Sequence, residues 1–271
     1  MRNRVKHGCG LLALLGAATL GSLDAQIIEL DHFADMTKYV DADTLVLLDI
    51  DDTILVPKQM LGSDEWFCAQ LQRNRETTSS REEALEQTLA QWEAIRMITK
   101  MELVEPGTND VIAMLQHRGH CVMGLTTQGF TLATRTSRQL AREGIFFTKT
   151  APTREEHYLQ LNGHGVLFRN GILFTSGTSK GESLFRWLDQ VGITPQRILF
   201  VNDKESHLRD VERGAEKHHV PFVGLRYAYS DARKRAFSME IADYQLLYST
   251  FNYLMSDEEA VAGLSVRQIA Q

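Results

Sequence analysis

The segment Leu45-Val46-Leu47-Leu48-Asp49-Ile50-Asp51-Asp52-Thr53 places three carboxylates at the end of an otherwise apolar run. An apolar run of this kind is typical of a parallel strand that is covered on both faces of a sheet. Carboxylates at the end of such a strand are costly unless a cation or hydrogen bonds compensate their charge. If the extended conformation continues, Asp49 and Asp51 point to the same side of the chain.

The carboxyl end of a parallel strand is also where an open α/β sheet binds its ligands. Asp49 and Asp51 are therefore well placed to hold Mg²⁺, a hard cation that prefers oxygen ligands. The structural alternative for this segment is an Asp-rich turn that caps a helix.

Strands and helices alternate along most of the chain. Apolar runs predict further strands at 120–125, 197–201 and 221–225. Helical periodicity occurs between them, at 107–117, 131–143, 180–191 and 204–217. This alternation predicts an α/β fold built on a Rossmann-like open parallel sheet.

Three stretches depart from the simple alternation. Residues 62–102 carry apolar side chains at helical spacing, which predicts a helical insertion at about 60–104. Asn170-Gly171 lies between two apolar runs and predicts a β-hairpin. The tail, 233–271, is helical in character. No linker divides the chain, so we expect one domain over 26–271 with the helical insertion inside it.

Three other segments bring reactive side chains to predicted strand ends or a helix start. The strand at 120–125 is followed by Thr126 and Thr127, and the strand at 197–201 by Asn202 and Asp203. Lys180 lies at the start of a helix, where its charge opposes the helix dipole. A bound anion near Lys180 would explain that placement.

Taken in order, these residues resemble the four motifs of the haloacid dehalogenase (HAD) superfamily. The resemblance rests on the DxDxT sequence at 49–53, on Thr126, on Lys180 and on Asp203. The segment Gly62-Ser63-Asp64-Glu65-Trp66-Phe67, with the Asn-Asp-Lys-Glu sequence at 202–205, further resembles DUF2608, a family of secreted bacterial HAD-like proteins.

The resemblance implies a phosphatase that works through an aspartyl-phosphate. Asp49 would be the nucleophile, and Asp51 would act first as general acid and then as general base. Asp49, Asp51 (through its backbone carbonyl) and Asp203 would hold Mg²⁺.

The remaining motif residues would bind a small phosphorylated substrate. Thr126, Thr127 and Lys180 would contact its phosphoryl oxygens. The insertion at about 60–104 lies where HAD enzymes carry a cap, and a rigid packing element is the equal alternative.

Two residues depart from the HAD pattern. Asn202 and His207 stand where some members have acidic side chains. This leaves a second reading open, a HAD-fold binding or host-interaction protein with little or no turnover. The presence of Asp51 favours phosphatase or phosphotransferase chemistry over dehalogenation.

The N-terminal 25 residues have the pattern of a secretory signal peptide. Three basic residues at positions 2, 4 and 6 precede an apolar run from Cys9 to Gly21, and the small residue Ala25 ends the segment. The run is shorter than the ~20 residues that span a bilayer, so we expect cleavage after Ala25 and no stable membrane insertion. The protein would then be secreted or periplasmic. An uncleaved anchor is the alternative.

Composition and net charge are those of an acidic globular protein, and they bear on which partners the chain can bind. The chain has 271 residues, 43% of them hydrophobic and 24% charged, as expected for a globular protein. Its net charge of −6 becomes about −8 without residues 1–25, and no basic block suggests nucleic-acid binding. Cys68 and Cys121 are interpreted as free, buried thiols. Oligomeric state is left open.

Overall fold

The computed structural model describes residues 26–250 and 252–269, so the predicted signal peptide lies outside the described residues. Its centre is an eight-stranded sheet of order β1-β10-β9-β2-β5-β8-β7-β6. The strands are β1 (Gln26–Leu30), β2 (Thr44–Leu48), β5 (Cys121–Thr126), β6 (His157–Leu161), β7 (His164–Arg169), β8 (Ile172–Phe174), β9 (Arg197–Asn202) and β10 (Phe222–Tyr227). In this sheet order, each strand from β1 through β10, β9, β2 and β5 to β8 is parallel to its neighbour, which confirms the predicted α/β fold.

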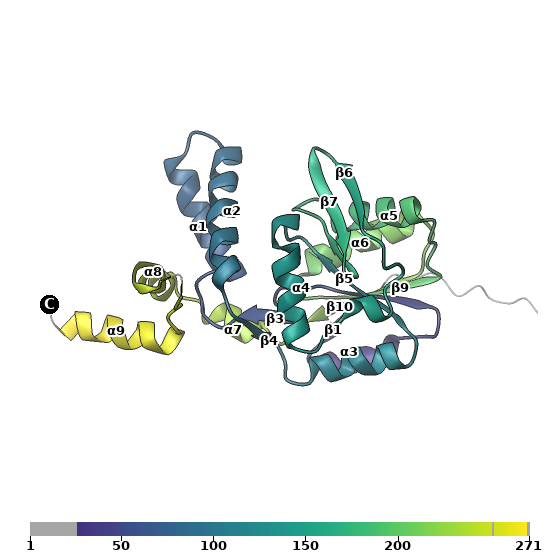
Figure 1. Cartoon of the computed structure of the whole chain (residues 1–271), viewed down its shortest axis with the longest axis horizontal. Coiled ribbons are helices and arrows are strands. Elements are labelled where there is room, and N and C mark those ends of the chain that lie inside the picture. The colour runs from purple at the N-terminus through teal and green to yellow at the C-terminus, as the bar shows by residue number, and fades with distance from the viewer. Residues whose placement is uncertain (1–25, 251, 270–271) are drawn as a thin grey trace, which may run out of the picture.

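Helices cover both faces of this sheet (Figure 1). The central strand β2 is buried at all five positions, as its unbroken apolar sequence predicts. One apolar core includes residues of α3 and α4, and a second core includes residues of α5 and α6. The helices are α3 (Thr108–His117), α4 (Ala133–Arg142), α5 (Lys180–Val191) and α6 (Glu205–Lys217), with short 3₁₀ turns η1 (Phe33–Tyr39), η2 (Phe130–Leu132) and η3 (Phe147–Lys149).

Two tight turns build the antiparallel edge of the sheet. Asn170 and Gly171 join β7 to β8 with φ of 54° and 76°, so the predicted hairpin is confirmed. Asn162 and Gly163 join β6 to β7 in the same way, with φ of 50° and 84°. The second hairpin carries the same Asn-Gly signal, but the sequence prediction did not include it. It also omitted β1, a partly exposed edge strand.

The helical insertion stands on a two-stranded stem. Strands β3 (Leu55–Pro57) and β4 (Met101–Leu103) pair antiparallel, and α1 (Asp64–Thr77) and α2 (Arg81–Ile98) lie between them in the chain. Ser63 and Ser80 cap the two helices by accepting hydrogen bonds from backbone N–H groups. Trp66 and Trp92 are buried in an apolar cluster that also includes Leu132 of η2 and Ala242 near the C-terminus, so both tryptophans pack between helices.

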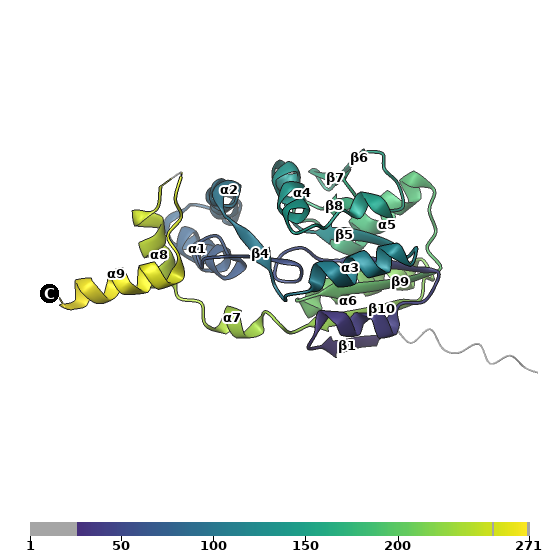
Figure 2. The ribbon, with the colours of Figure 1, turned by 60° about the horizontal axis from the view of Figure 1, so that its bottom comes forward.

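The C-terminal segment runs from the sheet back to the insertion (Figure 2). It consists of α7 (Asp231–Arg235), α8 (Met239–Tyr248) and α9 (Asp257–Ile269). Arg73 of α1 binds both carboxylate oxygens of Asp243 on α8, at 2.8 and 2.9 Å. The segment therefore connects the core to the insertion. Within the described ranges, no helix has the length and apolarity needed to cross a membrane.

Candidate functional site

The predicted motif residues meet at one edge of the sheet because their strands are neighbours. Strand β2 lies between β9 and β5, with Leu48 level with Val201 on one side and Gly124 on the other. Asp49 therefore leaves the sheet between Thr126 and Asn202. The carboxyl ends of parallel strands form the ligand-binding edge of such a sheet.

Both oxygens of Asp49 have partners. Its Oδ1 lies 2.8 Å from Nζ of Lys180 and accepts a hydrogen bond from the N–H of Ile50. Its Oδ2 accepts a 2.8 Å hydrogen bond from Nδ2 of Asn202. Burial raises the pKa of Asp49 to about 6, Lys180 opposes this rise, and the charge of Asp203 adds to it.

The placement of Lys180 depends on close contact between two helices. Its side chain is fully buried in the first turn of α5, and burial lowers its pKa although Asp49 opposes the shift. A Cβ at Gly181 would lie 2.3 Å from the carbonyl oxygen of Asp210 on α6, so only glycine permits this approach. Ser179, the N-cap of α5, also donates a hydrogen bond to Asp210. These contacts hold Lys180 against Asp49.

The carboxylate of Asp51 is held by the insertion and by the loop after β5. Oδ1 forms an ion pair with Arg96 of α2, whose side chain is 3% exposed. Oδ2 accepts a 2.7 Å hydrogen bond from Nε2 of Gln128. The amide of Gln128 is oriented by Thr136 of α4, whose hydroxyl donates to Oε1 at 2.6 Å. Sequence position suggests that Gln128 lines the site, but Arg96 and Thr136 were not predicted.

Asp203 interacts with one residue of the sheet domain and with one residue of the C-terminal segment. Its N–H donates a 3.1 Å hydrogen bond to Oγ1 of Thr53, the last residue of the first motif. Its carboxylate, 1% exposed, forms an ion pair with Lys234 of α7. No sequence motif marks Lys234.

A further ion pair joins the insertion to the core beside these residues. Lys204, directly after Asp203, pairs with Asp64 in the first turn of α1.

Burial raises the pKa of Asp52 well above its usual range, and the nearby charges of Asp64 and Asp203 add to the rise. The site thus concentrates acidic groups and balances them with lysines from several elements.

Thr126, the last residue of β5, and Thr127, the first residue after it, make different hydrogen bonds. The buried Thr126 accepts a hydrogen bond at Oγ1 from the N–H of Gln128, 3.2 Å away. The carbonyl of Thr127 accepts from the N–H of Gly177 at 2.9 Å. The hydrogen bonds of Asp49 go to Lys180, Ile50 and Asn202 and to neither of these threonines, although both threonines lie at the same sheet edge. Phe130, which could line the site by its position, is exposed beyond this loop.

The carboxylates fit a magnesium ion by their chemistry. Asp49 and Asp203 are buried, like-charged oxygen donors, a combination that favours a bound cation. Among the described residues, no three acidic, histidine or cysteine side chains are grouped to hold a metal. A third protein ligand would therefore have to come from the backbone, as the resemblance implies for the carbonyl of Asp51.

Some members of the HAD superfamily have an acidic side chain at the position of His207, and His207 does not take over the role of that acid. Burial, with the nearby cations Lys180 and Lys204, lowers the pKa of His207 to about 3, so its imidazole is neutral at pH 7. It cannot balance the charge of Lys180, which is paired with Asp49 instead.

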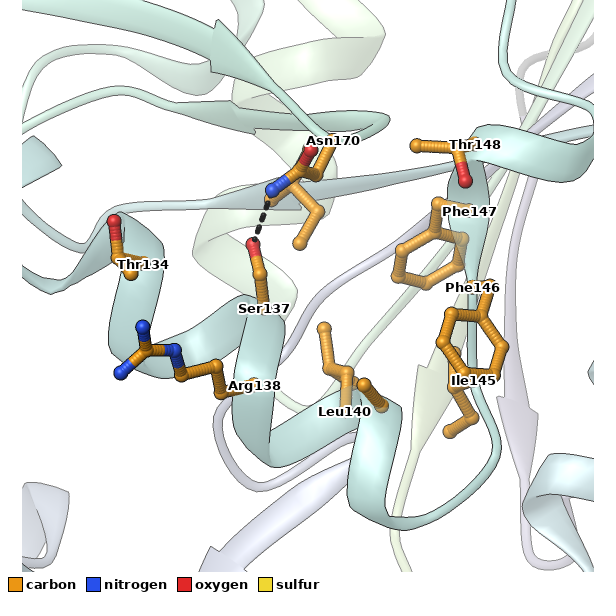
Figure 3. A pocket seen from close by; sticks show the side chains of 11 residues that line it. Thr134, Ser137, Arg138, Leu140, Ile145, Phe146, Phe147, Thr148 and Asn170 are labelled. Atoms are coloured by element: carbon orange, nitrogen blue, oxygen red, sulfur yellow. Dashed lines mark hydrogen bonds between the residues drawn. The ribbon is translucent and has the colours of Figure 1, made fainter.

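A separate cavity of about 340 Å³ lies beside α4 (Figure 3). Ser137 of α4 accepts a 3.3 Å hydrogen bond there from Asn170 in the β7–β8 turn. The lining residues include Leu140, Phe147 and Ile172 but none of the predicted site residues. This cavity is therefore not the carboxylate site.

Residues 29–261 match the model described as "Protein of unknown function (DUF2608)". The chain belongs to the DUF2608 family. This membership confirms the narrower of the two resemblances, and the matched residues include every predicted site residue.

Two relatives of this DUF2608 chain come from Chlamydia. A protein of Chlamydia pneumoniae named "Putative outer membrane protein" is 27% identical over 250 residues, covering 87% of this chain and 89% of the relative. A protein of the same name from Chlamydia trachomatis is 24% identical over 255 residues, covering 93% of this chain and 95% of the relative.

Solved structures show distant likeness to this DUF2608 chain. A HAD-superfamily hydrolase of subfamily IA from Geobacter sulfurreducens has a TM-score of 0.40 and 17% identity, covering 71% of this chain and 99% of that one. A haloacid dehalogenase-like hydrolase from Streptococcus pneumoniae has a TM-score of 0.41 and 10% identity, covering 67% and 93%.

Proposed function

We propose that this protein is an exported, Mg²⁺-dependent phosphatase that hydrolyses small phosphomonoesters through an aspartyl-phosphate. The observation that carries the proposal is the buried pair of Asp49 and Lys180, 2.8 Å apart at the ligand-binding edge of the sheet. A buried carboxylate beside a buried ammonium suits attack on an anionic phosphoryl group, because the cation offsets the repulsion between the two anions.

In the first step, a carboxylate oxygen of Asp49 attacks phosphorus and the ester P–O bond breaks. Asp51, in its protonated form, gives its proton to the leaving alkoxide, which departs as an alcohol. For this step Asp51 must leave its ion pair with Arg96 and take up a proton from solvent before it meets the leaving oxygen. Gln128 keeps the carboxyl group in place during the exchange, since it binds the other oxygen.

In the second step, water attacks the phosphorus of the aspartyl-phosphate. Asp51, now a carboxylate, takes a proton from that water, and the bond between phosphorus and Asp49 breaks. Inorganic phosphate leaves, and both aspartates return to their starting states. Lys180, with Thr126 and Thr127 on the neighbouring strand end, would bind the phosphoryl oxygens throughout.

A bound Mg²⁺ would supply positive charge that neutralises the phosphoryl group and the nucleophile. Asp49, Asp203 and the carbonyl of Asp51 would hold it. The insertion, tied to the site by Arg96 and by the Lys204–Asp64 pair, would exclude water and select the leaving group.

The N-terminal pattern supports export to the periplasm or beyond. The name shared by the two chlamydial relatives points to the cell envelope as well.

The proposal is tested with the chain from residue 26 and a generic aryl phosphate, with and without Mg²⁺. Phosphate release should require Mg²⁺ and should disappear in Asp49→Asn, which keeps the side-chain shape but lacks the nucleophilic oxygen. A control variant, Asp189→Asn, changes an aspartate on the exposed part of α5 and should leave the rate unchanged. Activity that survives Asp49→Asn would overturn the mechanism.

A binding or host-interaction protein with little turnover is the second candidate. It is favoured by the pairing of every carboxylate oxygen of Asp49 and Asp51 with a donor or cation. Calorimetric Mg²⁺ binding without turnover on a broad panel of phosphate esters, acyl phosphates and phosphoanhydrides would decide for this candidate and against the phosphatase.

A further inference from the structure

We propose that Lys234 is an internal cation that competes with Mg²⁺ for the carboxylate of Asp203, so that binding of the metal requires Lys234 to withdraw. This inference rests on the metal site of the proposed function. It adds a role for the C-terminal segment, which carries none of the four motifs.

The pairing of Lys234 with Asp203 is almost closed to solvent. The side chain of Asp203 is 1% exposed and that of Lys234 is 19% exposed. The ammonium group binds Oδ2 of Asp203, whose N–H is fixed to Thr53. Asp203 is therefore held in position by the core, and the partner that can move is the long, flexible lysine side chain.

The position of Lys234 is set by contacts of its own segment. Arg226 of β10 binds both carboxylate oxygens of Asp231, the first residue of α7, at 2.6 and 2.8 Å. Arg233 donates a hydrogen bond to the carbonyl of Pro57 at the base of the insertion. These bonds hold α7 against the site, and of its three basic residues Lys234 is the one directed to Asp203 while Arg235 is exposed.

Lys234 occupies Oδ2 of Asp203, and an ammonium group and a divalent cation repel each other strongly when both lie against one buried carboxylate. Without a metal, an unpaired Asp203 would be a buried charge, which is strongly destabilising, and Lys234 removes that penalty. The same pairing lowers the fraction of molecules that can accept Mg²⁺, and the apparent dissociation constant rises by the inverse of that fraction. If nine molecules in ten hold the Lys234 pair, Mg²⁺ binds about tenfold more weakly than it would to the free carboxylates.

The experiment is a calorimetric titration of the chain from residue 26 with Mg²⁺. The variants are Lys234→Met and, as a control, Arg235→Met, which removes the same charge from the same helix without touching Asp203. In Lys234→Met the Mg²⁺ dissociation constant should fall about tenfold, and in Arg235→Met it should stay within about twofold of the parent chain.

Thermal unfolding in EDTA gives a second measurement. Lys234→Met should melt at a lower temperature than Arg235→Met, and saturating Mg²⁺ should remove the difference. Lys234→Arg, which retains a cation, should keep the parent's weak Mg²⁺ binding. If Lys234→Met does not fold, Lys234→Gln takes its place in both measurements with the same expected direction.

Unchanged or weaker Mg²⁺ binding in Lys234→Met overturns the competition, as does a complete absence of Mg²⁺ binding in parent and variant. Neither measurement depends on turnover. Suppose that the parent chain hydrolyses no phosphate ester but Lys234→Met binds Mg²⁺ more tightly than the parent. That result would support the role of Lys234 and contradict the proposed phosphatase.

Discussion

Asn202 donates a 2.8 Å hydrogen bond from Nδ2 to Oδ2 of Asp49, so the residue before Asp203 is in direct contact with the proposed nucleophile. The side chain of Asn202 is fully buried, and its Oδ1 accepts a hydrogen bond from the N–H of Lys204. An amide satisfies both partners without adding charge. An aspartate here would instead place one more carboxylate against Asp49.

We therefore expect Asn202→Asp to destabilise the metal-free protein by about 3 kcal/mol, the scale of an uncompensated buried charge. Mg²⁺ should recover most of this loss, because the added carboxylate strengthens the cation site. Denaturant unfolding with EDTA and with Mg²⁺ measures both quantities. Asn202→Ala removes the hydrogen bond without adding charge, so Mg²⁺ should recover less of its lost stability. Equal recovery in the two variants would argue against the electrostatic explanation.

Gln128 should act on the rate more than on substrate binding. Gln128→Leu removes the donor to Asp51, and we expect kcat to fall by about tenfold or more while KM changes little, since a misplaced acid–base group affects the chemical step. Thr136→Val, which removes the hydroxyl that orients Gln128, should give a smaller fall. Steady-state kinetics with an aryl phosphate measure both.

The matched control for Thr136 is Thr134→Val, because Thr134 is exposed on the same helix and does not contact Gln128. A change in KM alone in Gln128→Leu would assign Gln128 to substrate binding instead.

His207 should make the folded state sensitive to acid. Its pKa is lowered to about 3 by burial and by Lys180 and Lys204, from an ordinary value of 6.5. Below pH 6.5 the unfolded chain takes up a proton that the folded chain does not, so stability falls as the pH decreases towards 3. At pH 4 the loss from this group is about 3 kcal/mol.

In His207→Gln this part of the loss should be absent, and the stability measured by urea unfolding should fall less between pH 7 and pH 4. The exposed His164 provides a control, since His164→Gln should keep the parent profile. Identical slopes for the parent and His207→Gln would contradict the assignment.

The two cysteines of the described chain should differ in reactivity. Both are free, but Cys68 is exposed and Cys121 is partly buried, so the expectation that both are buried was wrong for Cys68. Burial raises the pKa of Cys121 to about 11, which leaves little thiolate at pH 8. We expect a thiol reagent to label Cys68 at least about tenfold faster, with the fast phase absent in Cys68→Ser. A fast phase that persists in this variant would assign it to Cys121.

Local patterns in the sequence were enough to predict the fold and the centre of the site. The apolar run at 45–48 predicts a buried parallel strand, and Asn170-Gly171 predicts a turn, because both depend on residues close in the chain. Asp49 and Asp203 could be brought together in advance, because parallel strands present their carboxyl ends at one edge, and the resemblance to the HAD motifs added Lys180 at a helix start. The hairpin at Asn162-Gly163 was missed although its signal was present.

The partners of the site residues follow from tertiary packing and from no local pattern. Arg96 is 45 residues from Asp51, and Lys234 is 31 residues from Asp203. Arginine and lysine are common on helices, so no spacing distinguishes these two from cations that remain in solvent. They reach the carboxylates because the insertion and the C-terminal segment pack against the same edge of the sheet. Local sequence shows where negative charge gathers, and the packing of distant segments selects the cations that balance it.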